Sequence, residues 1–157
     1  MKHGWVVSFV VGCAGVLAAG QAQRAEAHHS FAMYDQSQTV TLTGKLTRFI
    51  AGANHAQLIF DVIGSDGKPE LDESGNKKIF GVETGPAAQI ADQGITVKSF
   101  PPGTILTVTA NPLRNGKPFG ALTRGGTIVK CGMELPKGGC NEKTGEVFDL
   151  ARPQPQQ

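Results

Sequence analysis

Alternation of apolar and polar side chains in two consecutive segments, residues 40–50 and 55–63, constrains the fold more than any other feature. Successive side chains of a β-strand point to opposite faces, so this period predicts two strands that each bury one face. In the second segment, His55 and Asp61 share the outward face. Gly44 interrupts the apolar row of the first segment, which predicts a bend or bulge of the kind that a small barrel needs.

The rest of the chain continues with short elements separated by turn signals. A helix is expected to start at Pro86 and to end before Gly94, because these residues suit the first turn and the C-terminal cap. Asn115-Gly116 is typical of a tight hairpin. The expected elements are a strand over 78–84, the helix over 86–93, a strand over 104–110, and a strand over 119–123 with a continuation over 127–130.

This order predicts a mainly β domain over residues 39–150. Three strands, one short helix and a two-strand hairpin form the order of an OB-fold, a small five-stranded barrel. The short helix then lies between strands 3 and 4. A small β-sandwich is the competing architecture. Residues 28–38 would form an N-terminal arm, and the Pro- and Gln-rich residues 151–157 predict a disordered tail.

Residues 1–27 have the features of a secretory signal peptide. An apolar run over 5–19 is followed by Ala25-Glu26-Ala27, which matches the small-x-small pattern of signal cleavage. The run is shorter than the roughly 20 residues that cross a membrane. We therefore expect cleavage after Ala27, a periplasmic or secreted protein, and no membrane attachment after cleavage. An uncleaved anchor, or a lipoprotein with lipid on Cys13, is the alternative.

Two cysteines of the mature chain, Cys131 and Cys140, are predicted to form a disulfide. Paired cysteines are oxidised outside the cytoplasm, and the glycine-rich segment between them can reach the bridging geometry. A metal–thiolate site is the alternative, but the chain lacks the Cys-x-x-Cys spacing that such sites use.

Charge and motifs exclude several functions. The chain has 15 Lys+Arg against 13 Asp+Glu, a formal charge of +2, without the basic excess of a nucleic-acid-binding protein. It carries no phosphate loop, dinucleotide fingerprint or nucleophile elbow. A hydrolase would need an acid/base pair, and the spacing of Asp35 and Asp61 does not force these two carboxyls together. We therefore expect a protein that is not an enzyme.

Three histidines form the most distinctive chemical feature. Cleavage after Ala27 would make His28 the first residue, whose α-amine and imidazole can chelate one metal ion. The two groups titrate near about 7.7–8.0 and about 6.5, so both can deprotonate near neutral pH, and such nitrogen ligands suit Cu(II). His29 and His55 could add imidazoles. Asp35 and Asp61 are candidates to accept hydrogen bonds from the imidazoles and so orient the rings. The alternative is that these histidines are ordinary solvated residues.

The N-terminal block resembles a family of short exported bacterial proteins classed as a domain of unknown function. Members share a His-His-Ser-Phe start, a Thr-Leu-Thr-Gly strand and an Asn-(Pro)-His-Ala motif. The matching segments here are His28 to Asp35, Val40 to Leu46, Asn54-His55-Ala56, Pro86 to Gln93 and Pro102-Gly103. The resemblance spans about residues 27–125 and implies a periplasmic β-rich barrel, with attention drawn to His28, His29 and His55. This chain lacks the family's proline before His55 and its following tryptophan, and the segment after Arg124 is an addition.

Two functions follow from these features. The first is an exported binding or accessory module whose partner is a small molecule, a metal or another exported protein. The second is a copper-binding protein that uses the His28 amine and imidazole together with His29 and His55. The mature N-terminus separates them, because the copper site depends on His28 being residue one.

Overall fold

A computed structural model describes residues 31–122 and 126–150 of the chain. The expected signal peptide, Cys13, His28, His29 and the C-terminal tail lie outside the described residues. The chain divides into two units, residues 1–31 and 32–157, and the elements below belong to the second unit except for the first residue of η1. The described elements are η1 Phe31–Met33, β1 Val40–Ile50, β2 Gln57–Val62, β3 Ile79–Glu83, α2 Ala87–Ala91, β4 Ile105–Pro112, β5 Phe119–Ala121, β6 Thr127–Lys130 and β7 Glu146–Asp149.

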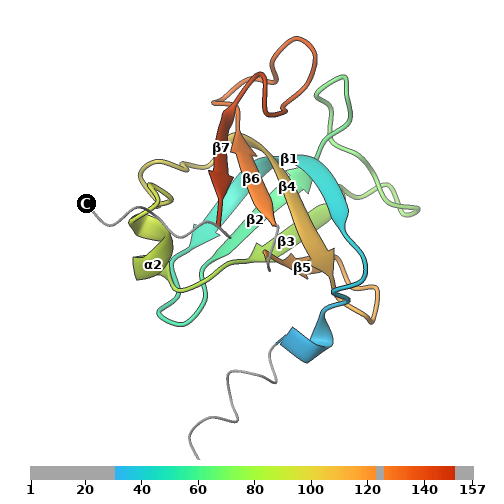
Figure 1. The fold of residues 1–157 in the computed structure, drawn as a ribbon. Coiled ribbons are helices and arrows are strands. Elements are labelled where there is room, and N and C mark those ends of the chain that lie inside the picture. The colour runs from blue at the N-terminus through green and yellow to red at the C-terminus, as the bar shows by residue number, and fades with distance from the viewer. Residues whose placement is uncertain (1–30, 123–125, 151–157) are drawn as a thin grey trace, which may run out of the picture. The chain divides into compact units, whose positions relative to one another are not determined.

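Five strands close into a barrel, which confirms the predicted fold class (Figure 1). The long strand β1 makes closure feasible, because its first half pairs with β4 and its second half pairs with β2, both antiparallel. β3 then pairs with β2 on one side and with β5 in parallel on the other, and β5 pairs with β4. The helix α2 connects strands 3 and 4 as expected, over fewer residues than the predicted 86–93.

Two further strands extend the sheet beyond the barrel. β6 pairs with the same edge of β4 as β5 does, so the predicted continuation is a separate strand. β7 pairs with β6 and was not predicted, because Glu146–Asp149 is too short for its alternation to stand out. Within the described residues, no helix has the length and apolar character needed to cross a lipid bilayer.

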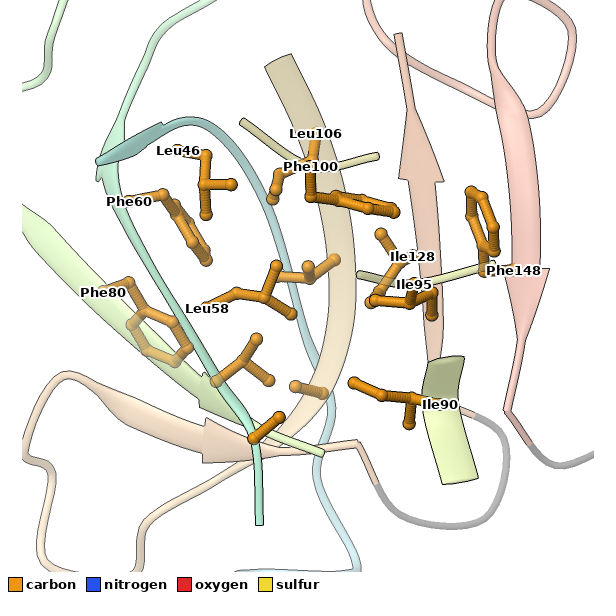
Figure 2. Packing of buried hydrophobic residues seen from close by; sticks show 14 of the residues in the cluster. Leu46, Leu58, Phe60, Phe80, Ile90, Ile95, Phe100, Leu106, Ile128 and Phe148 are labelled. Atoms are coloured by element: carbon orange, nitrogen blue, oxygen red, sulfur yellow. The ribbon is translucent and has the colours of Figure 1, made fainter. Parts of the chain in front are cut away.

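Apolar side chains from the inner faces of the strands fill the barrel (Figure 2). Leu58, Phe60 and Val82 from neighbouring strands are fully buried or nearly so, as the alternation predicted. Ile90 of α2 and Phe100, which precedes β4, belong to the same core, and Phe100 meets Phe148 of β7 with ring centroids 5.3 Å apart. Burial of these rings and branched chains is the main force that holds the domain together.

Gly44 has a different role from the predicted one. The irregularity in β1 lies between Leu46 and Arg48, not at Gly44. At Gly44 the strand faces the ring of Phe60, and a Cβ atom there would overlap that ring. The absence of a side chain at this position therefore makes room for a core aromatic ring instead of bending the strand.

The predicted disulfide is confirmed, with Cys131 and Cys140 bridged and their Cα atoms 5.7 Å apart. It closes the segment that follows β6 and holds it near β4, where the Thr107 hydroxyl donates a hydrogen bond of 2.8 Å to the Cys140 carbonyl. A small second cluster of buried side chains forms beneath this segment and includes Ile105 and Val129. The addition after residue 124 is therefore built into the domain.

Replacement of Gly44 by Ala tests the role of Phe60 packing. We expect Gly44→Ala to lower the free energy of unfolding by about 1–3 kcal/mol, because an added methyl group must displace a buried ring. Chemical denaturation measures this change. Gly64→Ala is the matched control, since a Cβ there would meet the movable Asp66 carboxylate as its nearest neighbour. Equal losses in both variants would contradict this explanation.

Removal of the disulfide tests how far it supports the barrel. We expect the double variant Cys131→Ser, Cys140→Ser to lose about 2–3 kcal/mol of stability, because a short closed loop restricts the unfolded chain. Circular dichroism should still report the β-rich fold, since the main core lies inside the five strands. Complete unfolding of the double variant under native conditions would show that the barrel depends on this bridge.

Candidate functional site

His55 lies in the loop 51–56 between β1 and β2, two residues before the first residue of β2. The sequence placed it within a strand over 55–63, so this boundary was wrong. Backbone hydrogen bonds of the next residue explain its position: the Ala56 N–H donates to Gly85 O at 3.0 Å, and the Ala56 carbonyl accepts from the Thr84 N–H at 2.9 Å. These bonds hold His55 beside the end of β3, with its side chain 38% exposed.

One ring nitrogen of His55 has two oxygen neighbours from β3 and the residue after it. His55 Nδ1 lies 3.2 Å from the Thr84 carbonyl oxygen and 3.4 Å from Glu83 Oε1. Glu83 is the last residue of β3, opposite Gln57 of β2 and Ala121 of β5, so its backbone is held from both sides. Its side chain is only 17% exposed.

Tyr34 brings the N-terminal arm to the same carboxylate. The residue follows η1, is 1% exposed, and forms a β-bridge with Leu113. Its phenol lies close enough to Glu83 for the carboxylate to act on its pKa. Two backbone bonds fix the surrounding arm: the Asp35 N–H donates to Pro112 O at 2.8 Å, and the Arg114 N–H donates to Met33 O at 3.0 Å.

Burial raises the pKa of Tyr34 to about 12, and the charge and hydrogen bond of Glu83 add to this effect. A negative carboxylate opposes formation of a second negative charge on the phenolate. The phenol therefore remains protonated, and available to donate its hydrogen bond, through the neutral pH range.

We call His55, Glu83 and Tyr34 the arm-end cluster. It lies at the end of the barrel that carries the loop 51–56 and the β4–β5 hairpin, the lower end in Figure 1. In OB-folds the loop between strands 1 and 2 and the loop between strands 4 and 5 contribute to ligand binding. The cluster therefore occupies a position from which a fold of this kind can contact a ligand.

The two carboxylates predicted to orient the histidine rings have other partners among the described residues. Asp35 accepts a hydrogen bond of 2.6 Å from the Ser37 hydroxyl, and this contact is the main reason that its pKa is lowered. Asp61 lies in β2 four residues beyond Gln57, about 13 Å further along the strand, where Lys77 Nζ contacts it at 2.8 Å. The structure does not bring Asp61 together with His55, and the carboxylate beside His55 is Glu83.

The sequence reasoning missed Glu83, Tyr34 and Thr84. Glu83 stands at the outward-facing end of a strand that the pattern did predict, but its closeness to His55 depends on the pairing of β2 with β3. Among residues 31–122 and 126–150, no group of three or more His, Cys, Asp or Glu could hold a metal ion. His28 and His29 lie outside that part of the chain.

Titration of Tyr34 tests the arm-end cluster directly, because Tyr34 is the only tyrosine of the chain. Tyrosinate absorbance should rise with a midpoint near pH 12 instead of about 10. Since the folded-state pKa is the higher one, this group stabilises the fold fully below about pH 10, and the contribution is lost as pH rises towards 12. A midpoint near 10 in the folded protein would contradict the buried contact with Glu83.

Comparison with known proteins agrees with the resemblance seen in the N-terminal block. A family model described as a family of unknown function (DUF6152) matches residues 16–123, which include the arm and all five barrel strands. No curated protein matches the chain. The chain belongs to this family of unknown function.

Proposed function

We propose that this protein is an exported binding module that is not an enzyme, with its ligand site at the arm-end cluster. The support for a site there is the grouping of a half-exposed imidazole, a mostly buried carboxylate and a buried phenol at one loop-bearing end of a closed barrel. Buried polar groups cost stability unless they are paired. The His55 side chain in this cluster is partly exposed, so a ligand can reach it and act as a further partner.

Export is supported by the sequence and by the disulfide. The signal-like residues 1–27 predict secretion, and a disulfide such as Cys131–Cys140 is typical of oxidising compartments. We expect the partner to be a small molecule, a metal ion or another exported protein. The near-neutral charge disfavours nucleic acid.

A copper ion is the specific ligand that one observation favours. Tyr34 fixes the arm at the same Glu83 carboxylate that lies beside His55. His29 is five positions before Tyr34 in the sequence, and five residues of extended chain reach at most about 18 Å. We propose that one metal ion is shared between the arm histidines and His55.

The donor set has the chemistry of a Cu(II) site. An α-amine and neutral imidazoles are nitrogen ligands, which Cu(II) prefers and binds more tightly than other divalent first-row ions do. We propose that the His28 amine and imidazole, His29 and the Nε2 atom of His55 supply these ligands. The barrel would contribute the fixed ligand, and the arm would contribute the others.

The test begins with the exported protein purified from the periplasm. Intact mass should show that the chain begins at His28. Cu(II) titration followed by electron paramagnetic resonance should then show one site with nitrogen coordination. His28→Ala and His55→Ala should each weaken binding at least tenfold, because each removes a ligand to the same ion.

Two outcomes would overturn these proposals. Retention of residues 1–27 would contradict export with cleavage. Equal, weak copper binding by wild type and His28→Ala would contradict the copper site. Lys78→Ala is the control for surface effects, because Lys78 pairs with Glu70 in the loop after β2, and it should leave copper binding unchanged.

A further inference from the structure

We infer that Glu83 is a positioning residue that, together with the Thr84 carbonyl, fixes the ring of His55 with its proton on Nδ1 and its lone pair on Nε2. This inference deepens the proposed copper site and depends on it for the identity of the ligand. The position of the ring proton follows from two distances at His55 Nδ1 and does not depend on copper binding.

The two neighbours of His55 Nδ1 determine where the proton lies. The Thr84 carbonyl oxygen, at 3.2 Å, can only accept a hydrogen bond. An ionised Glu83 Oε1, at 3.4 Å, can also only accept. Nδ1 must therefore donate, and a neutral imidazole has only one N–H. The other nitrogen, Nε2, then carries the lone pair that a metal ion requires.

Glu83 is held where it can act on this ring. Its backbone carbonyl accepts from the Leu122 N–H at 2.8 Å, and its strand pairs with β2 and β5. The side chain of Tyr34, which is almost fully buried, lies close enough to Glu83 for the carboxylate to raise the pKa of the phenol. Within the described residues, His55 is the only basic side chain at ion-pair distance from Glu83.

The arrangement matches a known role for carboxylates around metals. A metal-bound histidine usually donates its other ring N–H to a carboxylate or a backbone carbonyl, which fixes the ring and makes it a stronger ligand. Here both kinds of acceptor lie at Nδ1. Loss of such a partner typically lowers metal affinity by about 10–100-fold.

The first measurement needs no metal. Long-range ¹H–¹⁵N spectra of the exported protein, at a pH where the imidazole is neutral, report which ring nitrogen of His55 carries the proton. We expect Nδ1 to be protonated in wild type and in Asp61→Asn, the control at the far end of β2. Glu83→Ala should raise the share of the Nε2-protonated form, because the Thr84 carbonyl alone then holds the ring proton. Protonation of Nε2 in wild type would overturn the inference, whether or not the protein binds copper.

The second measurement is Cu(II) affinity in the same variants. Glu83→Gln keeps the size of the side chain but removes its charge, so we expect affinity to fall about tenfold or more. Glu83→Asp, which restores the charge, should recover part of the affinity.

The results separate this inference from the proposed function. If wild type has the expected ring proton but binds no copper, the copper proposal fails and the assignment of the ring stands. A second outcome is that wild type binds copper through His55. If Glu83→Gln and Glu83→Ala then bind copper with the wild-type affinity and keep the proton on His55 Nδ1, Glu83 is not a positioning residue. Unchanged thermal unfolding of Glu83→Gln confirms that any loss is not a loss of fold.

Discussion

The pairing of β1 with two different partners is the constraint on which the rest of the structure depends. The first half of this strand bonds to β4 and the second half to β2, so one continuous segment closes the barrel. Residues Gly44 and Lys45 pair with both neighbours, and the space above Gly44 is filled by the Phe60 ring. Closure satisfies the backbone hydrogen bonds of strands that would otherwise be exposed edges, and it encloses the apolar core.

Barrel closure also assembles the arm-end cluster from segments that are distant in sequence. β2 brings the loop with His55 beside the end of β3, where Glu83 lies. β4 continues past its pairing with β1 to the β4–β5 hairpin, where Leu113 forms a β-bridge with Tyr34. The cluster is therefore a product of the strand topology.

The sequence predicted the order of strands because β1 to β4 each have apolar residues at period two, and Asn115-Gly116 marks the turn before β5. It also predicted the Cys131–Cys140 bridge from composition and compartment. It could not predict the separate strand β7, whose four residues carry too little periodicity, or the role of Gly44, which depends on a ring from another strand. His55 was found from its residue type, whereas its partner Glu83 was missed because only the pairing of β2 with β3 brings the two together.

The most direct test of the central claim is an anomalous-scattering crystal structure of the exported protein soaked with Cu(II), recorded at the copper absorption edge. The claim is that the arm-end cluster presents one fixed nitrogen ligand on a rigid barrel. It predicts one strong copper peak at bonding distance from His55 Nε2, with Glu83 still beside Nδ1. A copper peak bound elsewhere with His55 Nε2 unoccupied, or a peak at Nδ1, would contradict it.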